Sequence, residues 1–102
     1  GSIAQNSIQQ FRFDHAVIGC SALRKNGDLM DFDMQEVSVS KAIIEQSDHV
    51  TVVADSSKFE RKAPALVATM QDVSSIVTDK KVPSDCEIQC GATGTEIVYT
   101  MN

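Results

Sequence analysis

The residues most capable of chemistry in this chain stand directly after a run of apolar residues. The run Val50–Ala54 breaks into Asp55, Ser56, Ser57 and Lys58. A lysine can neutralise an anion, serine hydroxyls can donate hydrogen bonds, and a carboxylate can accept them from sugar hydroxyls. The same residue types also form ordinary loops, in which Asp and Ser cap a turn and Lys is solvated. The pattern therefore leaves open a site for a phosphate or carboxylate ligand and a purely structural loop.

Two further apolar runs end in polar side chains. Ser21 follows the run that begins at His15, and Asp79 closes the run that begins at Ile76. The carboxyl ends of parallel strands share one edge of a sheet, and ligands of open α/β sheets bind beyond that edge. We therefore expect these groups to lie on the same edge as the loop at Asp55.

The elements that would position these groups follow from residue pattern. Short apolar runs rich in β-branched residues indicate buried strands, and a helix is expected from Met34 to Ser47. The succession of strand, helix and strand predicts a right-handed crossover and a parallel sheet. The expected fold class is therefore α/β with a mostly parallel sheet. We expect strands at His15–Ser21, Val50–Ala54, Ile76–Asp79 and Glu96–Thr100, and a further short strand at Leu66–Met70.

The remaining segments are expected to be short helices, turns or loops. Asn26-Gly27 has the residue types of a tight turn, because both tolerate positive φ. Apolar spacing favours an opening helix over Ile3–Phe11. Gln71–Ser75 would form a single helical turn, and Pro83–Gly94 a loop or weak helix.

Glu36 has two readings. Asp33 and Glu36 have the spacing of a capping box, in which the first side chain caps the helix and the acid three residues later reaches back. On a helix Glu36 and Ser40 project from the same face, so Glu36 could also contact a ligand there. Helix-start statistics favour the capping role, and ligand contact remains the alternative.

Composition and charge exclude several classes of protein. The chain has 102 residues, which suits one domain, and 42% hydrophobic and 23% charged residues are typical of a folded globular protein. The net charge is −5 and no Lys/Arg cluster occurs along the sequence, which argues against direct binding to nucleic-acid phosphates. No apolar run approaches the roughly 20 residues of a membrane span. A cytoplasmic protein without membrane contact is expected.

No metal, cofactor or catalytic group is expected. Cys86 and Cys90 lack further Cys or His residues at zinc spacing, so reduced thiols are favoured over a metal site. His15 and His49 each precede an apolar run, which indicates boundary residues at the entry edge of the sheet. The segment Gly91–Gly94 lacks the lysine and the preceding strand of a phosphate-binding loop.

Five stretches, taken in order, carry a family resemblance. The chain resembles the carboxyl-terminal effector domain of DeoR-family transcriptional repressors, and the block from Asp55 to Phe59 is its most specific part. Departures from the usual family pattern include Arg24, where an acid is common, Ser40, where a lysine is common, and Glu60, where a glycine is common. The matching stretches are Phe13–Ser21, Gly27–Asp33, Glu36–Ile44, Ala54–Phe59 and Ile76–Asp79.

The resemblance implies a three-layer α/β domain related to ribose-phosphate isomerases and CoA-transferases. It implies a sensor without catalysis, which binds a phosphorylated sugar or polyol and forms a homo-oligomer. Residues 1–102 would be the second half of the effector domain. The helix-turn-helix that binds DNA and the first half of the domain, which holds the phosphate, would lie outside them, although Gly1-Ser2 could also be a cloning remnant.

The resemblance implies that certain residues of this chain bind the ligand. The expected ligand-binding residues are Glu36, Asp55, Lys58, Ser21 and Asp79.

Two alternative functions remain. One is a sugar-phosphate isomerase-like enzyme that uses Glu36 and Lys58, and the other is an oligomerisation module with exposed apolar sheet faces.

Overall fold

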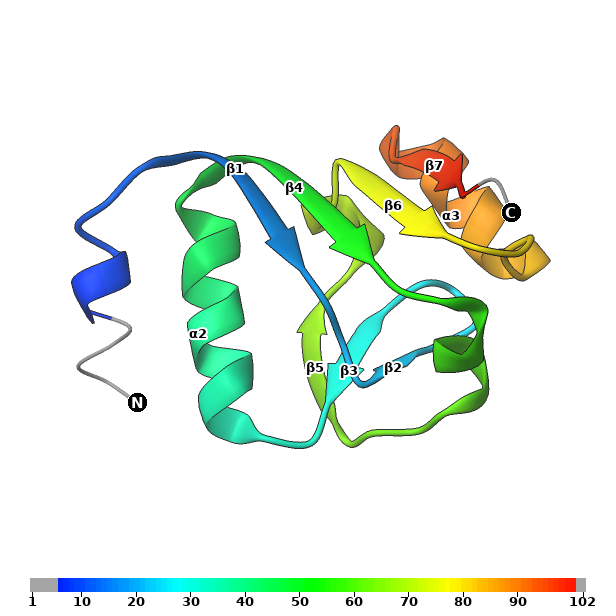
Figure 1. Cartoon of the computed structure of the whole chain (residues 1–102), viewed down its shortest axis with the longest axis horizontal. Coiled ribbons are helices and arrows are strands. Elements are labelled where there is room, and N and C mark those ends of the chain that lie inside the picture. Colours follow the sequence, from blue (N-terminus) through cyan, green and yellow to red (C-terminus); the bar gives the residue numbers. More distant parts are fainter. Residues whose placement is uncertain (1–5, 101–102) are drawn as a thin grey trace.

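A four-stranded parallel sheet forms the backbone of the fold. The computed structural model describes residues 6–100, and Figure 1 shows the sheet running across the upper part of the molecule. All neighbouring strands in it are parallel, so their carboxyl ends share one edge. In spatial order the strands are β1 (Phe13–Ile18), β4 (Ser47–Val53), β6 (Ser75–Thr78) and β7 (Glu96–Tyr99).

A small antiparallel sheet packs beneath the parallel one. β2 (Ala22–Leu23) and β3 (Leu29–Asp31) form a hairpin, and β5 (Ala65–Ala68) pairs with β3. The hairpin turn needs Gly27, which has φ of 94°. A Cβ at Gly27 would also lie 2.8 Å from Met70 Cγ, so the turn is pressed against the core.

Two full helices, two short 3₁₀ turns and a helical segment at residues 6–8 complete the described chain. The helix α2 (Met34–Glu45) starts at the N-cap Asp33. The helix α3 (Ser84–Thr93) ends at Gly94 in the left-handed region, as is common at helix ends. The 3₁₀ turns are η1 (Ser56–Glu60) and η2 (Met70–Asp72). Within residues 6–100, no helix combines the length and the apolar character that crossing a membrane requires.

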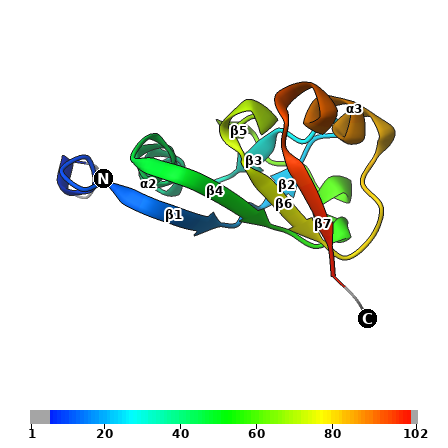
Figure 2. The same ribbon diagram turned by 90° about the horizontal axis from the view of Figure 1, so that it is seen from above.

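One face of the parallel sheet is covered and the other is open. Figure 2 shows α2, the small sheet and α3 all on the same side of the parallel sheet. On that side Val52 and Ile76 are fully buried, whereas on the other Val17 is 68% and Val53 50% exposed. Parallel sheets are usually covered on both faces. The described residues therefore form two layers, the parallel sheet and the elements that cover one of its faces.

The α/β class, the parallel sheet and the helix from Met34 are confirmed. The predicted strand at Leu66–Met70 exists as β5, but it belongs to the antiparallel sheet, which periodicity cannot distinguish from the parallel one. The segment Pro83–Gly94 contains a regular ten-residue helix. Residues 6–8 of the expected opening helix are helical, and residues 1–5 lie outside the described residues.

The two histidines are inside strands, so their prediction as boundary residues was wrong. β1 and β4 begin earlier than expected, because Phe13 N–H donates to Gln46 O at 2.8 Å and the ladder extends over polar residues. His15 and His49 pair across the open face with ring centroids 4.5 Å apart. His15 Nε2 lies 2.7 Å from Thr51 Oγ1.

Ile76→Ala tests the covered core. Ile76 is fully buried in the central strand β6. Removing its side chain should lower the free energy of unfolding by about 2 to 5 kcal/mol, because apolar contacts are lost and a cavity remains. Ile88→Ala is the matched control, since Ile88 is 69% exposed on α3 and its loss should change stability by less than about 1 kcal/mol. Urea unfolding followed by circular dichroism measures both, and equal effects would contradict the described packing.

Candidate functional site

Loops that follow the parallel strands meet at the carboxyl edge of the sheet. β1, β4 and β6 are neighbours, and η1 follows β4 after Asp55. Ser56 N–H donates to Asp79 Oδ1 at 2.7 Å, which ties the loop after β4 to the loop after β6. The prediction that these strand ends share one edge is confirmed.

A polar cavity opens beside the end of β1. Its volume is about 610 Å³, within the usual range for small-molecule sites. The carboxyl end of β1, the end of β3 and the first turns of α2 supply its walls. We call it the edge cavity, and its polar or reactive lining residues are Cys20, Ser21, Asp31, Asp33, Gln35, Glu36 and Ser40.

Ser21 and Asp31 form a hydrogen-bonded pair in the edge cavity. Ser21 Oγ donates to Asp31 Oδ1 at 2.8 Å, and Phe32 N–H donates to the same oxygen at 2.8 Å. These bonds fix the carboxylate. Within residues 6–100, Asp31 Oδ2 accepts no hydrogen bond, so it is available to a ligand hydroxyl.

The N-cap of α2 positions Glu36. Asp33 Oδ1 accepts from Gln35 N–H at 2.8 Å and from Glu36 N–H at 3.4 Å, which confirms Asp33 as the cap. The reciprocal half of the predicted capping box is not formed in the described part of the chain, where the Glu36 carboxylate makes no hydrogen bond. Glu36 is exposed and lines the edge cavity together with Ser40, so its carboxylate can accept from a ligand.

Asp55 caps the 3₁₀ turn η1, which is the structural role that the sequence left open beside ligand binding. Its Oδ1 accepts from Ser57 N–H at 2.9 Å, and the Ser57 hydroxyl donates to the same oxygen. The bond from the Ser57 hydroxyl, followed by that from Ser57 N–H, lowers the pKa of Asp55 below its usual range. Asp55 and Lys58 do not line the edge cavity.

Asp79 also makes a hydrogen bond within the loops at this edge. The hydrogen bond from Ser56 N–H lowers the pKa of the Asp79 carboxyl. Because the Asp55 and Asp79 pKa values are both lowered on folding, their ionisation stabilises the fold above their usual pKa range. That stabilisation is lost as the pH falls through the folded-state values.

Lys58 and Asp55 still act electrostatically on the edge cavity, through Cys20. Burial raises the pKa of the Cys20 thiol to about 11. The positive charge of Lys58 opposes this rise in pKa, and the carboxylates of Asp31 and Asp55 add to it. The two predicted residues therefore lie within electrostatic range of the cavity wall.

Asp31 and Cys20 were missed by sequence reasoning. Both lie within stretches that carry the family resemblance, but no spacing rule indicates that Asp31 faces Ser21 across ten residues of chain. Their proximity follows from the β2–β3 hairpin, which returns the chain to the end of β1. Among residues 6–100, no three His, Cys, Asp or Glu side chains cluster as a metal site would require.

The parallel sheet and the polar cavity at its carboxyl edge define a class of protein. This is an open α/β domain, a class in which ligands commonly bind beyond the carboxyl ends of the strands. A protein-family model described as the DeoR C terminal sensor domain matches residues 1–80. The chain belongs to that family. The match includes every residue of the edge cavity, whereas α3 and β7 lie beyond it.

Curated relatives are transcriptional regulators by name. A glycerol-3-phosphate regulon repressor of Haemophilus influenzae is 42% identical over 76% of this chain and 31% of its own length. A repressor of the same name in Escherichia coli is 39% identical over 81% of this chain and 33% of its own. An L-fucose operon activator of Haemophilus influenzae is 24% identical over 88% of this chain and 36% of its own. The chain thus spans about a third of the length of these relatives.

Cys20 reactivity tests the electrostatics of the edge cavity. The thiolate is the reactive form, so with a pKa of about 11 Cys20 should be labelled very slowly by Ellman's reagent at pH 8 and faster as the pH approaches 11. Lys58→Met removes the charge that lowers the pKa of Cys20, so labelling should slow further, whereas Lys41→Met should leave it unchanged. The variant Cys86→Ser/Cys90→Ser isolates the signal of Cys20. Rapid labelling at pH 7 would contradict this assignment.

Proposed function

We propose that this chain is the carboxyl-terminal part of the effector-sensing domain of a DeoR-type transcriptional regulator. The edge cavity binds a phosphorylated sugar or polyol, and binding controls a helix-turn-helix domain outside residues 1–102. The observation that carries the proposal is the convergence of Ser21, Asp31 and Glu36 on one cavity in a chain of this sensor family.

The chemistry of the edge cavity suits hydroxyl groups. Asp31, Asp33 and Glu36 line it, and no Lys or Arg of the described part of the chain does. Carboxylates accept hydrogen bonds from sugar or polyol hydroxyls, but they repel phosphate. The hydroxyl-bearing end of an effector therefore binds here, and its phosphate is held by groups outside the lining of the edge cavity.

The relatives suggest which probe to test first. Two of them are named as glycerol-3-phosphate regulon repressors. Glycerol 3-phosphate combines two hydroxyls with one phosphate, which matches this division of the site. It is therefore the first ligand to test.

Effector control follows if ligand and protein conformation are coupled. The edge cavity joins the end of β1 to the start of α2, so a ligand that bridges them favours one relative position of these elements. A ligand can shift an equilibrium only by its difference in affinity for the two states. The ligand therefore controls the regulator to the extent that it bridges β1 and α2 in one conformational state and not in the other.

The open face of the parallel sheet supports the assignment as part of a larger domain. Val17, Val53 and Val98 are 68%, 50% and 37% exposed there, although such sheets are usually covered on both faces. The other two thirds of a protein as long as the relatives would include the missing layer. Alternatively, a second copy of the chain covers this face, as it would in an oligomerisation module.

Effector binding can be measured by calorimetry in the longer regulator that the proposal implies. Asp31→Asn and Glu36→Gln should each weaken glycerol 3-phosphate binding about tenfold, because each loses a charge-assisted hydrogen bond. Glu45→Gln is the matched control, since Glu45 is an exposed acid at the other end of α2. The isolated 102-residue chain should bind more weakly than the longer protein.

Two results would overturn this assignment. One is operator affinity that no sugar phosphate changes. The other is turnover of ribose or glucosamine phosphates, which would favour the isomerase-like alternative. The isomerase-like alternative needs Glu36 and Lys58 to contact the same substrate. Of these two residues, Glu36 lines the edge cavity and Lys58 does not.

The open face has its own test in the isolated chain. Val17→Lys/Val53→Lys places two charges on the exposed valines and should reduce self-association, measured by static light scattering, without lowering the melting temperature by more than a few degrees. Ile88→Lys, an equally exposed site on α3, is the control and should leave association unchanged. A dimer that forms only with sugar phosphate, or that survives the double substitution, would contradict this use of the face.

A further inference from the structure

A second cleft lies apart from the edge cavity. It is about 490 Å³ in volume and is formed by the β2–β3 hairpin, the end of η1 and the segment that follows η1. Four cationic side chains and one acidic side chain, Glu60, contribute to its lining. We call it the basic cleft, and its cations are Arg24, Lys25, Arg61 and Lys62.

The tertiary structure creates this concentration of positive charge. The chain has a net charge of −5 and nine Lys and Arg residues, of which the basic cleft gathers four. An adjoining cleft of about 540 Å³ shares Lys25 and adds Lys80 and Lys81. Six of the nine cations therefore surround two neighbouring hollows, although they come from three separate segments of sequence.

Among residues 6–100, no ion pair neutralises the cations of the basic cleft. Over residues 6–100, the ion pairs are Arg12 with Asp48 and Lys81 with Glu87. No carboxylate of the described residues thus lies within ion-pair distance of the cations that line the basic cleft. Uncompensated charges in a concave site attract counter-ions and anionic ligands.

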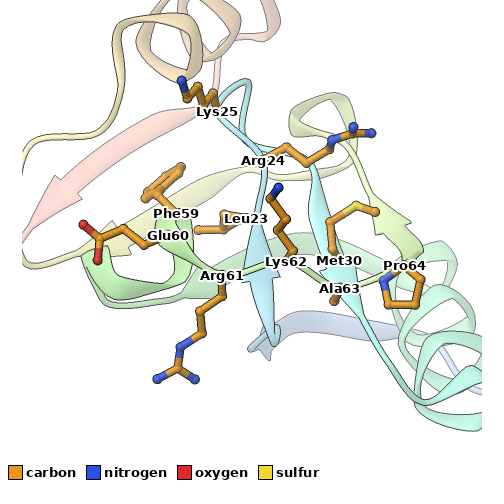
Figure 3. Close-up of a pocket in the computed structure, with 10 residues that line it drawn as sticks. All are labelled: Leu23, Arg24, Lys25, Met30, Phe59, Glu60, Arg61, Lys62, Ala63 and Pro64. Carbon is orange, nitrogen blue, oxygen red and sulfur yellow. The ribbon is translucent and has the colours of Figure 1, made fainter.

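The floor of the basic cleft is apolar. Leu23 is 1% and Met30 8% exposed, and both line it. Figure 3 shows Arg24 and Lys62 reaching over this floor from the two walls. The charged ends of the other ionic lining residues, Lys25, Glu60 and Arg61, point away from it. Cationic groups above an apolar floor suit a molecule that has both an anionic group and an apolar part.

We propose that the basic cleft is a second ligand site, which takes a small organic anion with a phosphate or carboxylate group and an apolar body. Arg24 and Lys62 bind the anionic group, and the floor of Leu23 and Met30 packs against the apolar part. The concave shape and the apolar floor favour such a ligand over duplex DNA, whose backbone requires cations on a broad surface. This site does not depend on the effector assignment of the edge cavity.

Phenyl phosphate and inorganic phosphate are suitable probes, titrated into the isotope-labelled 102-residue chain and followed by amide NMR shifts. Phenyl phosphate should saturably shift residues 23–25, 30 and 59–64, and it should bind more tightly than inorganic phosphate because it also covers the floor. Equal affinity of the two probes, or shifts confined to the edge cavity, would overturn the proposal.

Charge-matched variants separate the site from general attraction. Arg24→Gln/Lys62→Gln should weaken phenyl phosphate binding at least about tenfold, because two charge-assisted contacts are lost. Arg12→Gln/Lys41→Gln removes the same charge elsewhere and should change affinity little, as should Glu36→Gln in the edge cavity. The proposal fails if both double variants lose affinity equally. It also fails if duplex DNA or glycerol 3-phosphate displaces the probe, since the first would indicate a DNA contact and the second a single effector site.

Discussion

The parallel pairing of β1, β4 and β6 is the constraint on which the rest of the structure depends. Val52 and Ile76 pair with each other in the two inner strands and are fully buried, so their burial holds the strands in register. Parallel strands need a crossover between them, and α2 provides it between β1 and β4. Strand ends and the N-terminus of α2 are thereby brought to one edge, where the edge cavity forms.

The loops at this edge are held by short hydrogen-bonded links. Asp79 accepts from Ser56 N–H, Asp55 from Ser57, and Asp31 from Ser21. In each of these bonds a carboxylate accepts from a loop amide or a hydroxyl, in place of a backbone carbonyl. Each of these links uses one carboxylate oxygen, and within residues 6–100 the acidic groups of the edge cavity that accept no hydrogen bond are Asp31 Oδ2, Asp33 Oδ2 and the Glu36 carboxylate. The same residue type thus supports the structure at one position and is available to a ligand at another.

Acidic and basic side chains are separated more clearly in the folded structure than along the sequence. The edge cavity is lined by acids, and the basic cleft gathers cations from segments 24–25 and 61–62. The absence of a Lys/Arg run in the sequence is therefore a poor guide to the local potential. The hairpin turn at Gly27 and the loop after η1 bring these segments together, and neither carries a charge pattern that predicts the other.

Sequence by itself determined the α/β class, the parallel order of elements and the family, because these depend on local periodicity and on ordered short motifs. It also singled out Ser21 and Glu36, which the structure brings to one cavity. Only the tertiary structure decided that Asp55 and Asp79 hold loops, that Asp31 faces Ser21, that the histidines pair on an open sheet face, and that six cations surround two hollows. The physical reason is that such contacts join residues far apart in the chain, and their geometry follows from packing rather than from local residue preference.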